Sequence, residues 1–132
     1  MLQQKKTRCT AKIRHGALLE KTDEAAYWLG FLMADGSVSS SSNEIKLKLG
    51  LKDFGQIKKF GAYLGLPAAR CRAYEKEALV AFSDRHVKNV LAGYGISPQK
   101  TFTAEVKSPH LINNRFFWAG FIDGDGTLGK YP

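Results

Sequence analysis

Two acidic residues, Asp35 and Asp125, occupy the same position in two copies of one sequence motif. Residues 27–37 and 117–127 align without a gap, and both copies carry an aromatic residue, Trp, Gly, Phe, an aliphatic residue, a small residue, Asp-Gly and a hydroxyl residue. A carboxylate at the C-terminal end of a helix faces the negative end of the helix dipole, which costs about 0.3–1 kcal/mol. Two such placements at matched positions indicate a function. Carboxylate oxygens suit Mg²⁺, and a metal held between carboxylates and phosphate oxygens assists phosphodiester hydrolysis.

Small residues lie four positions apart in each motif: Gly30 and Ala34 in the first, Gly120 and Gly124 in the second. Residues four apart share one helical face, where small residues let another helix approach closely. Glycine inside a helix costs about 0.5–1 kcal/mol relative to alanine, so a close contact is the expected compensation. We therefore predict that the two motif helices pack on each other about a local two-fold axis. If they are parallel, both carboxylates reach one end of the pair, where a shared cation offsets their repulsion.

Hydrophobic periodicity and breaker residues divide the chain into helical and strand segments. Thr22 or Asp23 is the expected cap of the first helix, Gly36 its stop, and Asp53 a plausible cap of the second helix. The expected elements are helix 23–35, a short strand or loop 37–42, strand 44–52, helix 53–64, strands 70–76 and 78–83, helix 84–93, connector 96–109 and helix 114–125. This order predicts an α+β fold.

Basic side chains alternate along two of the predicted strands. One face of each strand then packs on the core, and the other presents positive charge. Such faces suit a concave sheet laid in the DNA major groove, where most basic residues meet phosphates and a few read bases. A solvent-facing side of an amphipathic sheet is the plainer alternative. The candidate DNA-binding residues are Lys46, Lys48, Arg70, Arg72, Tyr74 and Lys76.

Composition favours a protein with a polyanionic partner. The 132 residues carry a net charge of +8 and a pI of about 9.6, which is typical of nucleic-acid binding although charge alone also serves solubility. The sequence contains no transmembrane stretch and no secretory signal, so we expect an intracellular protein without a membrane partner. Cys9 and Cys71 have no metal-like or redox-like spacing and are expected to be free thiols.

The two repeated segments resemble the LAGLIDADG motif, and the chain is similar to LAGLIDADG homing endonucleases. This resemblance implies a half of αββαββα order with a four-stranded antiparallel saddle, followed by the second motif helix. It also implies that Asp35 and Asp125 bind Mg²⁺ and act in catalysis, and that the intact protein makes a site-specific double-strand break in DNA. Family members belong to mobile genetic elements and are associated with introns or inteins. The first motif departs from the pattern at Met33, where the second has Asp123, but that position is not the metal-binding one in the family.

The resemblance also suggests a catalytic lysine and a domain division. A lysine near the family's active site often organises water or stabilises charge, and Lys52 is the first candidate here and Lys100 the second. The expected division is a basic lead at 1–22 that is flexible or loosely packed, a first half at 23–97, a connector at 98–113, and a second motif helix at 114–132 whose half is truncated. A second polypeptide could supply the missing half.

Two other interpretations stay open. The chain could be a DNA- or RNA-binding module that does not cleave, such as a maturase or a regulator. It could also be an inactive remnant, in which case exposed aromatic residues of the second motif would promote self-association. The aromatic residues concerned are Phe116, Phe117, Trp118 and Phe121.

Overall fold

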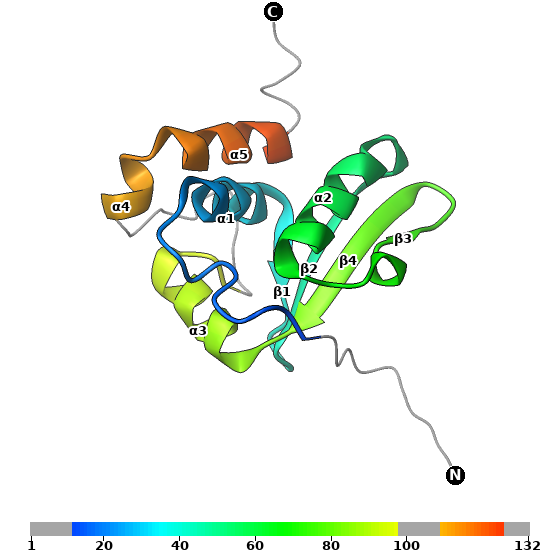
Figure 1. The fold of residues 1–132 in the computed structure, drawn as a ribbon, viewed down its shortest axis with the longest axis horizontal. Coiled ribbons are helices and arrows are strands. Elements are labelled where there is room, and N and C mark those ends of the chain that lie inside the picture. The colour runs from blue at the N-terminus through cyan, green and yellow to red at the C-terminus, as the bar shows by residue number, and fades with distance from the viewer. Residues whose placement is uncertain (1–11, 98–108, 126–132) are drawn as a thin grey trace, which may run out of the picture.

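The computed structural model describes residues 12–97 and 109–125, the last of them by its backbone alone (Figure 1). Its elements are α1 (Asp23–Asp35), β1 (Gly36–Val38), β2 (Glu44–Gly50), η1 (Leu51–Asp53), α2 (Phe54–Leu64), η2 (Ala68–Arg70), β3 (Arg72–Ala73), β4 (Glu77–Ser83), α3 (Arg85–Tyr94), α4 (Pro109–Ile112) and α5 (Arg115–Asp125). None of the helices in these ranges combines the length and apolar character needed to cross a membrane.

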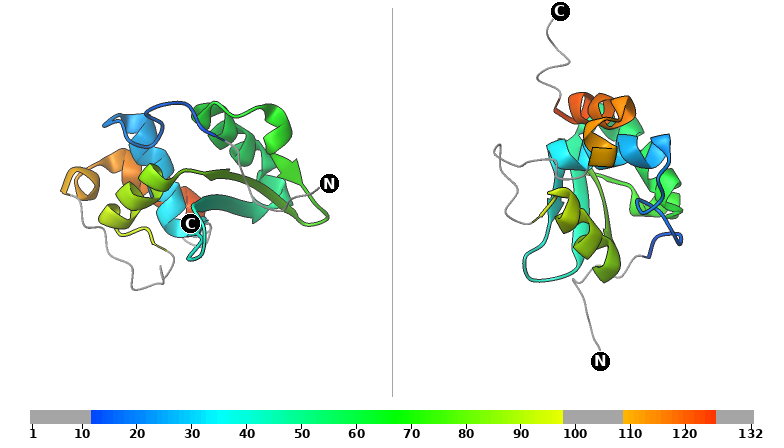
Figure 2. Two further views of the ribbon diagram at one scale, coloured as in Figure 1. Left: turned by 90° about the horizontal axis from the view of Figure 1, so that it is seen from below. Right: turned by 90° about the vertical axis from the view of Figure 1, so that its left-hand side faces the viewer.

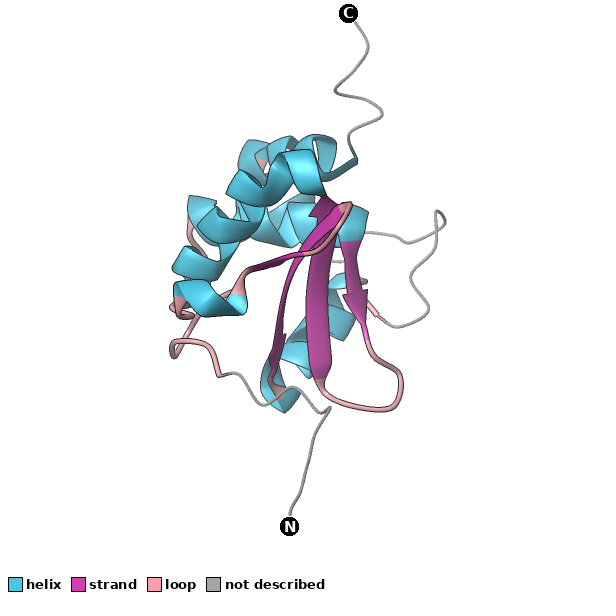
Figure 3. Ribbon diagram, turned by 90° about the vertical axis from the view of Figure 1, so that its right-hand side faces the viewer, coloured by secondary structure: helices cyan, strands magenta, loops and turns pink. Residues whose placement is uncertain are grey.

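The strands form one antiparallel sheet in the order β1-β2-β4-β3 (Figure 3). Leaving aside the 3₁₀ turns, the elements from α1 to α3 follow one another as helix, two strands, helix, two strands, helix. The predicted α+β class and the four-stranded antiparallel sheet are therefore confirmed.

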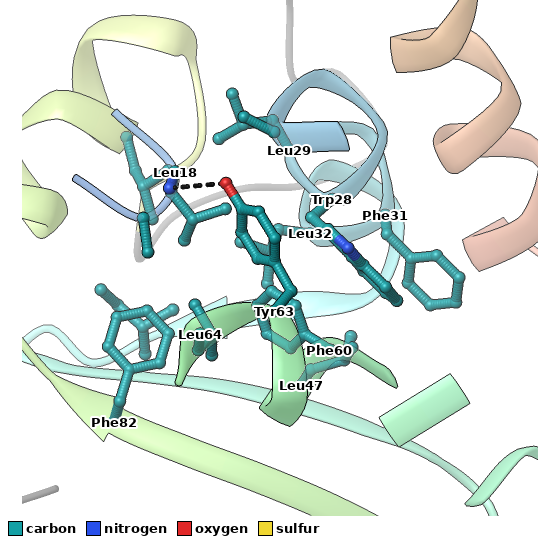
Figure 4. Packing of buried hydrophobic residues seen from close by; sticks show 14 of the residues in the cluster. Leu18, Trp28, Leu29, Phe31, Leu32, Leu47, Phe60, Tyr63, Leu64 and Phe82 are labelled. Atoms are coloured by element: carbon teal, nitrogen blue, oxygen red, sulfur yellow. Dashed lines mark hydrogen bonds between the residues drawn. The ribbon is translucent and has the colours of Figure 1, made fainter. Parts of the chain in front are cut away.

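One face of the sheet carries the core. Buried and less buried residues alternate along β2 and β4, so that Ile45, Leu47 and Phe82 point toward the helices. Helix α1 is buried on most sides, and its Trp28 ring packs 4.9 Å from the Phe60 ring of α2 (Figure 4). Because the described helices cover this face, the opposite face of the sheet is open in the part of the chain that the structure describes.

Short polar side chains begin three of the helices. Thr22 caps α1 by accepting a hydrogen bond from the Ala25 amide at 3.1 Å, as predicted. Asp84 accepts from the Val87 amide at 3.0 Å, and Asn114 accepts from the Phe116 amide at 2.8 Å. Each cap satisfies backbone N–H groups that have no partner within the helix.

Asp53 lies at the N-cap position of α2, as expected, but its side chain makes no capping hydrogen bond. Residues 51–53 form a 3₁₀ turn that runs directly into α2. At the other end of α2, Gly65 adopts φ 80°, a left-handed conformation that ends the helix as expected. Gly36 also ends its helix, but with extended backbone. A side chain there would press on Leu32, so close approach, not left-handed geometry, requires the glycine.

The described part of the expected loose lead packs against the helices. The Arg14 amide donates to the Leu64 carbonyl at 2.8 Å, and its guanidinium lies 4.7 Å from the centre of the Tyr63 ring. Ala17 and Leu18 are fully buried, and the Leu18 amide donates to the Tyr63 hydroxyl at 3.0 Å (Figure 4). The expectation of a loose segment is therefore wrong for residues 12–22, although residues 1–11 lie outside the described range.

Helices α1 and α5 form the most extensive helix–helix contact of the described structure, and the views of Figure 2 show them side by side. A Cβ on Gly30 would overlap the Phe117 carbonyl oxygen, and a Cβ on Gly120 would overlap the Tyr27 carbonyl oxygen. Phe117 is the repeat counterpart of Tyr27, so the two contacts are reciprocal and relate the helices by a local two-fold axis.

The same contacts define the direction of the pair. Gly120 faces Tyr27 and Phe31, and Gly124, one turn later, faces Phe31 and Ala34. Since residue numbers rise together along both helices, α1 and α5 run parallel.

Replacing either interface glycine should therefore destabilise the folded protein. We expect Gly30→Ala and Gly120→Ala each to lower the free energy of unfolding by about 3 kcal/mol, because the added methyl overlaps backbone that cannot move aside alone. The matched control is Gly93→Ala in α3, where a Cβ would meet nothing within 4 Å and which should stabilise by about 0.5–1 kcal/mol. Urea unfolding followed by circular dichroism measures all three, and equal effects at the three positions would contradict the backbone contact.

Candidate metal centre and nucleic-acid interface

The C-terminal ends of α1 and α5 converge. A Cβ built on Gly124 would lie 3.0 Å from the Ala34 Cβ, and these two residues directly precede Asp125 and Asp35. The Asp35 side chain is exposed at the end of α1, while the Asp125 side chain lies outside the described residues. The predicted meeting of the two carboxylates therefore stays a prediction, and the described geometry brings together the backbone positions beside them.

Both helix ends favour a cation. Parallel helices place the negative ends of two dipoles together, and the last turns of α1 and α5 contain no basic residue. Among the side chains that the structure describes, no group of three or more His, Cys, Asp or Glu residues is placed to hold a metal. Asp35 thus contributes one described carboxylate, and a hard cation such as Mg²⁺ would draw its remaining oxygens from Asp125, from water or from a bound phosphate.

The two candidate catalytic lysines have different outcomes. Lys52 is exposed in the 3₁₀ turn between β2 and α2. Lys100 lies outside the described residues. The role of each stays a prediction.

The open face of the sheet carries three of the candidate DNA-binding residues. Lys46 lies between Ser37 and Ala81 in the strand register, and Lys48 and Arg72 both flank Leu79. These rows together include all four strands, and the neighbours of Lys46 are the small residues Ser37 and Ala81, while Lys48 and Arg72 lie on either side of Leu79.

The other three candidates lie outside the strands of the sheet. The expected strand 70–76 is mostly wrong, because β3 contains only Arg72 and Ala73. Arg70 ends a 3₁₀ turn, and Tyr74 closes the hairpin by donating its amide to the Glu77 carbonyl at 2.7 Å. Lys76 follows in the same hairpin turn, so Arg72 is the one of these four residues that lies in a strand.

Two acids reduce the positive charge of the open face. Glu44 and Glu77 have the same strand parity as the lysines, and Glu77 lies 3.4 Å from Lys48 in a solvent-exposed ion pair. Exposed pairs of this kind contribute about 0–1 kcal/mol and are screened by salt. Lys46 and Arg72 therefore remain the basic residues of the face without such an ion pair among the described contacts.

A polar group that the sequence did not predict joins three helices beside the α1–α5 contact. The Tyr27 hydroxyl donates to Asp123 Oδ2 at 2.6 Å and accepts from Gln56 Nε2 at 2.7 Å. Burial raises the pKa of the Tyr27 phenol far above its ordinary value, and the hydrogen bond to Asp123 raises that pKa further. The phenol therefore stays neutral and holds its proton toward the carboxylate.

A signal for this group does exist in the repeat. Tyr27 corresponds to Phe117 in the second motif, and Asp123 corresponds to Met33 in the first. Each copy thus has a polar residue where the other copy is apolar. In two helices related by a two-fold axis, such a complementary difference indicates a pair across the axis.

Comparison with protein-family models, with curated proteins and with solved structures finds no match for this chain. Any function proposed for this protein therefore rests on the repeated motif and on the geometry described above.

The raised pKa of Tyr27 has a measurable consequence at alkaline pH. A pKa that is higher in the folded than in the unfolded chain contributes stability below about pH 10, and this contribution is lost as pH rises through the folded-state pKa. We expect Tyr27→Phe to reduce the alkaline loss of unfolding free energy and to remove one late-titrating phenol from the absorbance titration at about 295 nm. Asp123→Asn is the control, because it keeps an acceptor but removes the charge, and it should lower the pKa of Tyr27. A titration curve unchanged by Tyr27→Phe would contradict the assignment.

Proposed function

We propose that this protein is a metal-dependent DNA endonuclease of the LAGLIDADG homing type. The observation that carries the proposal is the reciprocal contact of the repeated helices, which places Gly124 beside Ala34 and so brings the positions preceding Asp125 and Asp35 together. Two acids at the converging negative ends of parallel helices are costly without a cation. Hydrolysis of a phosphodiester is the chemistry for which such an arrangement is suited.

In the proposed mechanism Asp35 and Asp125 would hold Mg²⁺ at the end of the helix pair. A bound Mg²⁺ would supply a water molecule of lowered pKa and offset negative charge on the phosphate oxygens. Asp35 would fix the position of the site relative to the sheet, because β1 follows it directly. Lys52 is the described candidate for a lysine that stabilises charge nearby.

The open face of the sheet is the proposed DNA-binding surface. Lys46, Lys48 and Arg72 extend across it in register, and β1, which lies at one edge, continues directly from the end of α1. A duplex on this face would therefore run toward the proposed metal centre. Contacts to phosphates would position the duplex, while base contacts from the same strands would provide specificity.

The internal symmetry points to a second half around α5. Trp28 and Leu32 of α1 are 4% and 1% exposed, whereas their repeat counterparts Trp118 and Ile122 are 38% and 41% exposed. The expectation of exposed aromatic residues is wrong for Phe117, which is fully buried against α1. A second unit related to the first by the local two-fold axis would cover Trp118 and Ile122 and would add a second sheet, from the same chain or from another polypeptide.

The acid at the end of α1 provides the direct test of cleavage. A duplex target is first selected from a randomised library by its binding to the protein, and is then incubated with protein and Mg²⁺. We expect Asp35→Asn to lower the cleavage rate by about 100-fold or more while DNA binding is retained, because the substitution removes a metal ligand and not a DNA contact.

Asp53→Asn is the matched control for that experiment. Asp53 is exposed and makes no capping hydrogen bond, so its cleavage rate should equal that of the unsubstituted protein. Cleavage by Asp35→Asn at the unsubstituted rate would overturn the proposed metal centre.

The binding surface is tested separately from cleavage. We expect Lys46→Gln and Arg72→Gln each to weaken DNA binding and to reduce the slope of log affinity against log salt by about 1, because each removes one phosphate contact. Lys59→Gln on the exposed side of α2, away from the open face of the sheet, is the control and should leave the slope unchanged. Equal effects at all three positions would show attraction by net charge alone.

The second candidate function is DNA or RNA binding without cleavage. It is favoured by one observation: the strands that the structure describes form a single sheet, with one candidate binding face. Binding of the selected duplex without cleavage in Mg²⁺ or Mn²⁺ would support this function over the nuclease.

A further inference from the structure

The two sides of the α1–α5 pair differ in chemistry. On one side the Tyr27 hydroxyl of α1 donates to the Asp123 carboxylate of α5 at 2.6 Å. The two-fold axis relates these positions to Phe117 of α5 and Met33 of α1, which are 0% and 5% exposed. One side of the axis is thus polar and hydrogen-bonded, and the other side has an apolar residue at both positions.

Like-with-like pairing, in which α1 packs on α1 or α5 packs on α5 of a second copy, would separate Tyr27 from Asp123 and Phe117 from Met33. If two copies of α1 packed in the same geometry, Tyr27 would face Met33 on both sides, and neither phenol would find the carboxylate to which it now donates. If two copies of α5 packed together, Phe117 would face Asp123 on both sides, and each carboxylate would lie against an apolar ring. The half-buried Tyr27 hydroxyl loses its acceptor in the first arrangement, which disfavours it, while the exposed Asp123 carboxylate loses its phenol donor in the second and keeps access to water.

The Tyr27 hydroxyl is poorly suited to a methionine neighbour for a further reason. Gln56 Nε2 of α2 already donates to the phenol oxygen at 2.7 Å, so the hydroxyl proton must be directed to another acceptor. Asp123 is that acceptor, and its Oδ2 lies at hydrogen-bonding distance. Gln56 of α2 therefore orients the Tyr27 hydroxyl so that it can donate to an acceptor at the position of Asp123.

We propose that Tyr27, Asp123, Met33 and Phe117 form a pairing code that selects the α1–α5 contact over α1–α1 and α5–α5 contacts between copies of the chain. The glycine contacts allow the two backbones to approach closely. They cannot discriminate between α1 and α5 as partners, because both helices carry the glycines at equivalent positions. Discrimination comes from the polar pair of the half-buried Tyr27 and the exposed Asp123, which lies at the edge of the helix contact. The code operates whether or not the protein cleaves DNA.

A cysteine at position 34 reports on like-with-like pairing. Ala34 faces Gly124, its own repeat counterpart, so in an α1–α1 contact position 34 would face position 34 of the second copy. Ala34 is half-buried, and any effect of the added thiol on the helix contact is common to all variants of the reporter chain. The reporter is the full chain with Ala34→Cys and Cys9→Ser; Cys71 is kept because it is buried.

The code is removed by the double substitution Tyr27→Phe and Asp123→Met in the reporter chain. This variant places a Phe–Met pair on both sides of the axis, as the chain already has at Phe117 and Met33, so its melting temperature should stay close to that of the reporter. Under mild oxidation we expect disulfide-linked dimer to form about ten-fold faster than in the unsubstituted reporter. Tyr27→Phe alone is the second variant and should also accelerate dimer formation, because it places a phenyl ring without a hydroxyl opposite Met33 in an α1–α1 contact.

General loss of stability is controlled by Ile57→Val. Ile57 is fully buried in α2, and its truncation lowers the melting temperature without touching the code. We expect no acceleration of cross-linking in this variant. The proposal is overturned if the double variant and Tyr27→Phe cross-link at the rate of the reporter, or if Ile57→Val accelerates cross-linking as much as they do. Neither outcome depends on DNA or metal, so it leaves the proposed nuclease function untouched.

Discussion

The direct backbone contact between α1 and α5 is the constraint on which the described structure depends. Gly30 and Gly120 leave no side chain between the helices at the crossing, so the carbonyl groups of Phe117 and Tyr27 fit against them. This contact fixes the parallel direction and the register of the pair. Because α1 leads directly into β1, it also fixes where the sheet lies relative to the helix ends.

The symmetric glycine contact does not by itself determine which helix packs on which, and the asymmetric Tyr27–Asp123 bond does. Two helices with the same small residues can pack on themselves as readily as on each other, and close packing alone does not select a partner. The bond between Tyr27 and Asp123 supplies the difference, and Gln56 extends it into α2. Closeness and selectivity therefore reside in different residues of the same interface.

Local patterns allowed much of this fold to be predicted from the sequence. Helix α1 was predicted at its observed bounds, because its capping Thr22 and its apolar run are local signals. Strand β3 was predicted too long, because alternation from Arg70 to Lys76 mimics a strand while the chain turns before Arg72 and after Ala73. The Tyr27–Asp123 bond joins residues 96 positions apart, so no single window contains it and only comparison of the two repeats indicates it. The position of the Asp35 carboxylate relative to a metal is likewise set by tertiary packing and not by spacing.

The glycine contact also limits how the protein can change over evolutionary time. Where side chains meet side chains, a larger residue on one helix can be accommodated by a smaller one on the other. At Gly30 and Gly120 the neighbour is main chain, which no mutation can shorten. These two positions therefore have no compensating second-site substitution, and lineages diverging from this protein would vary the residues around the crossing while the crossing itself stays frozen.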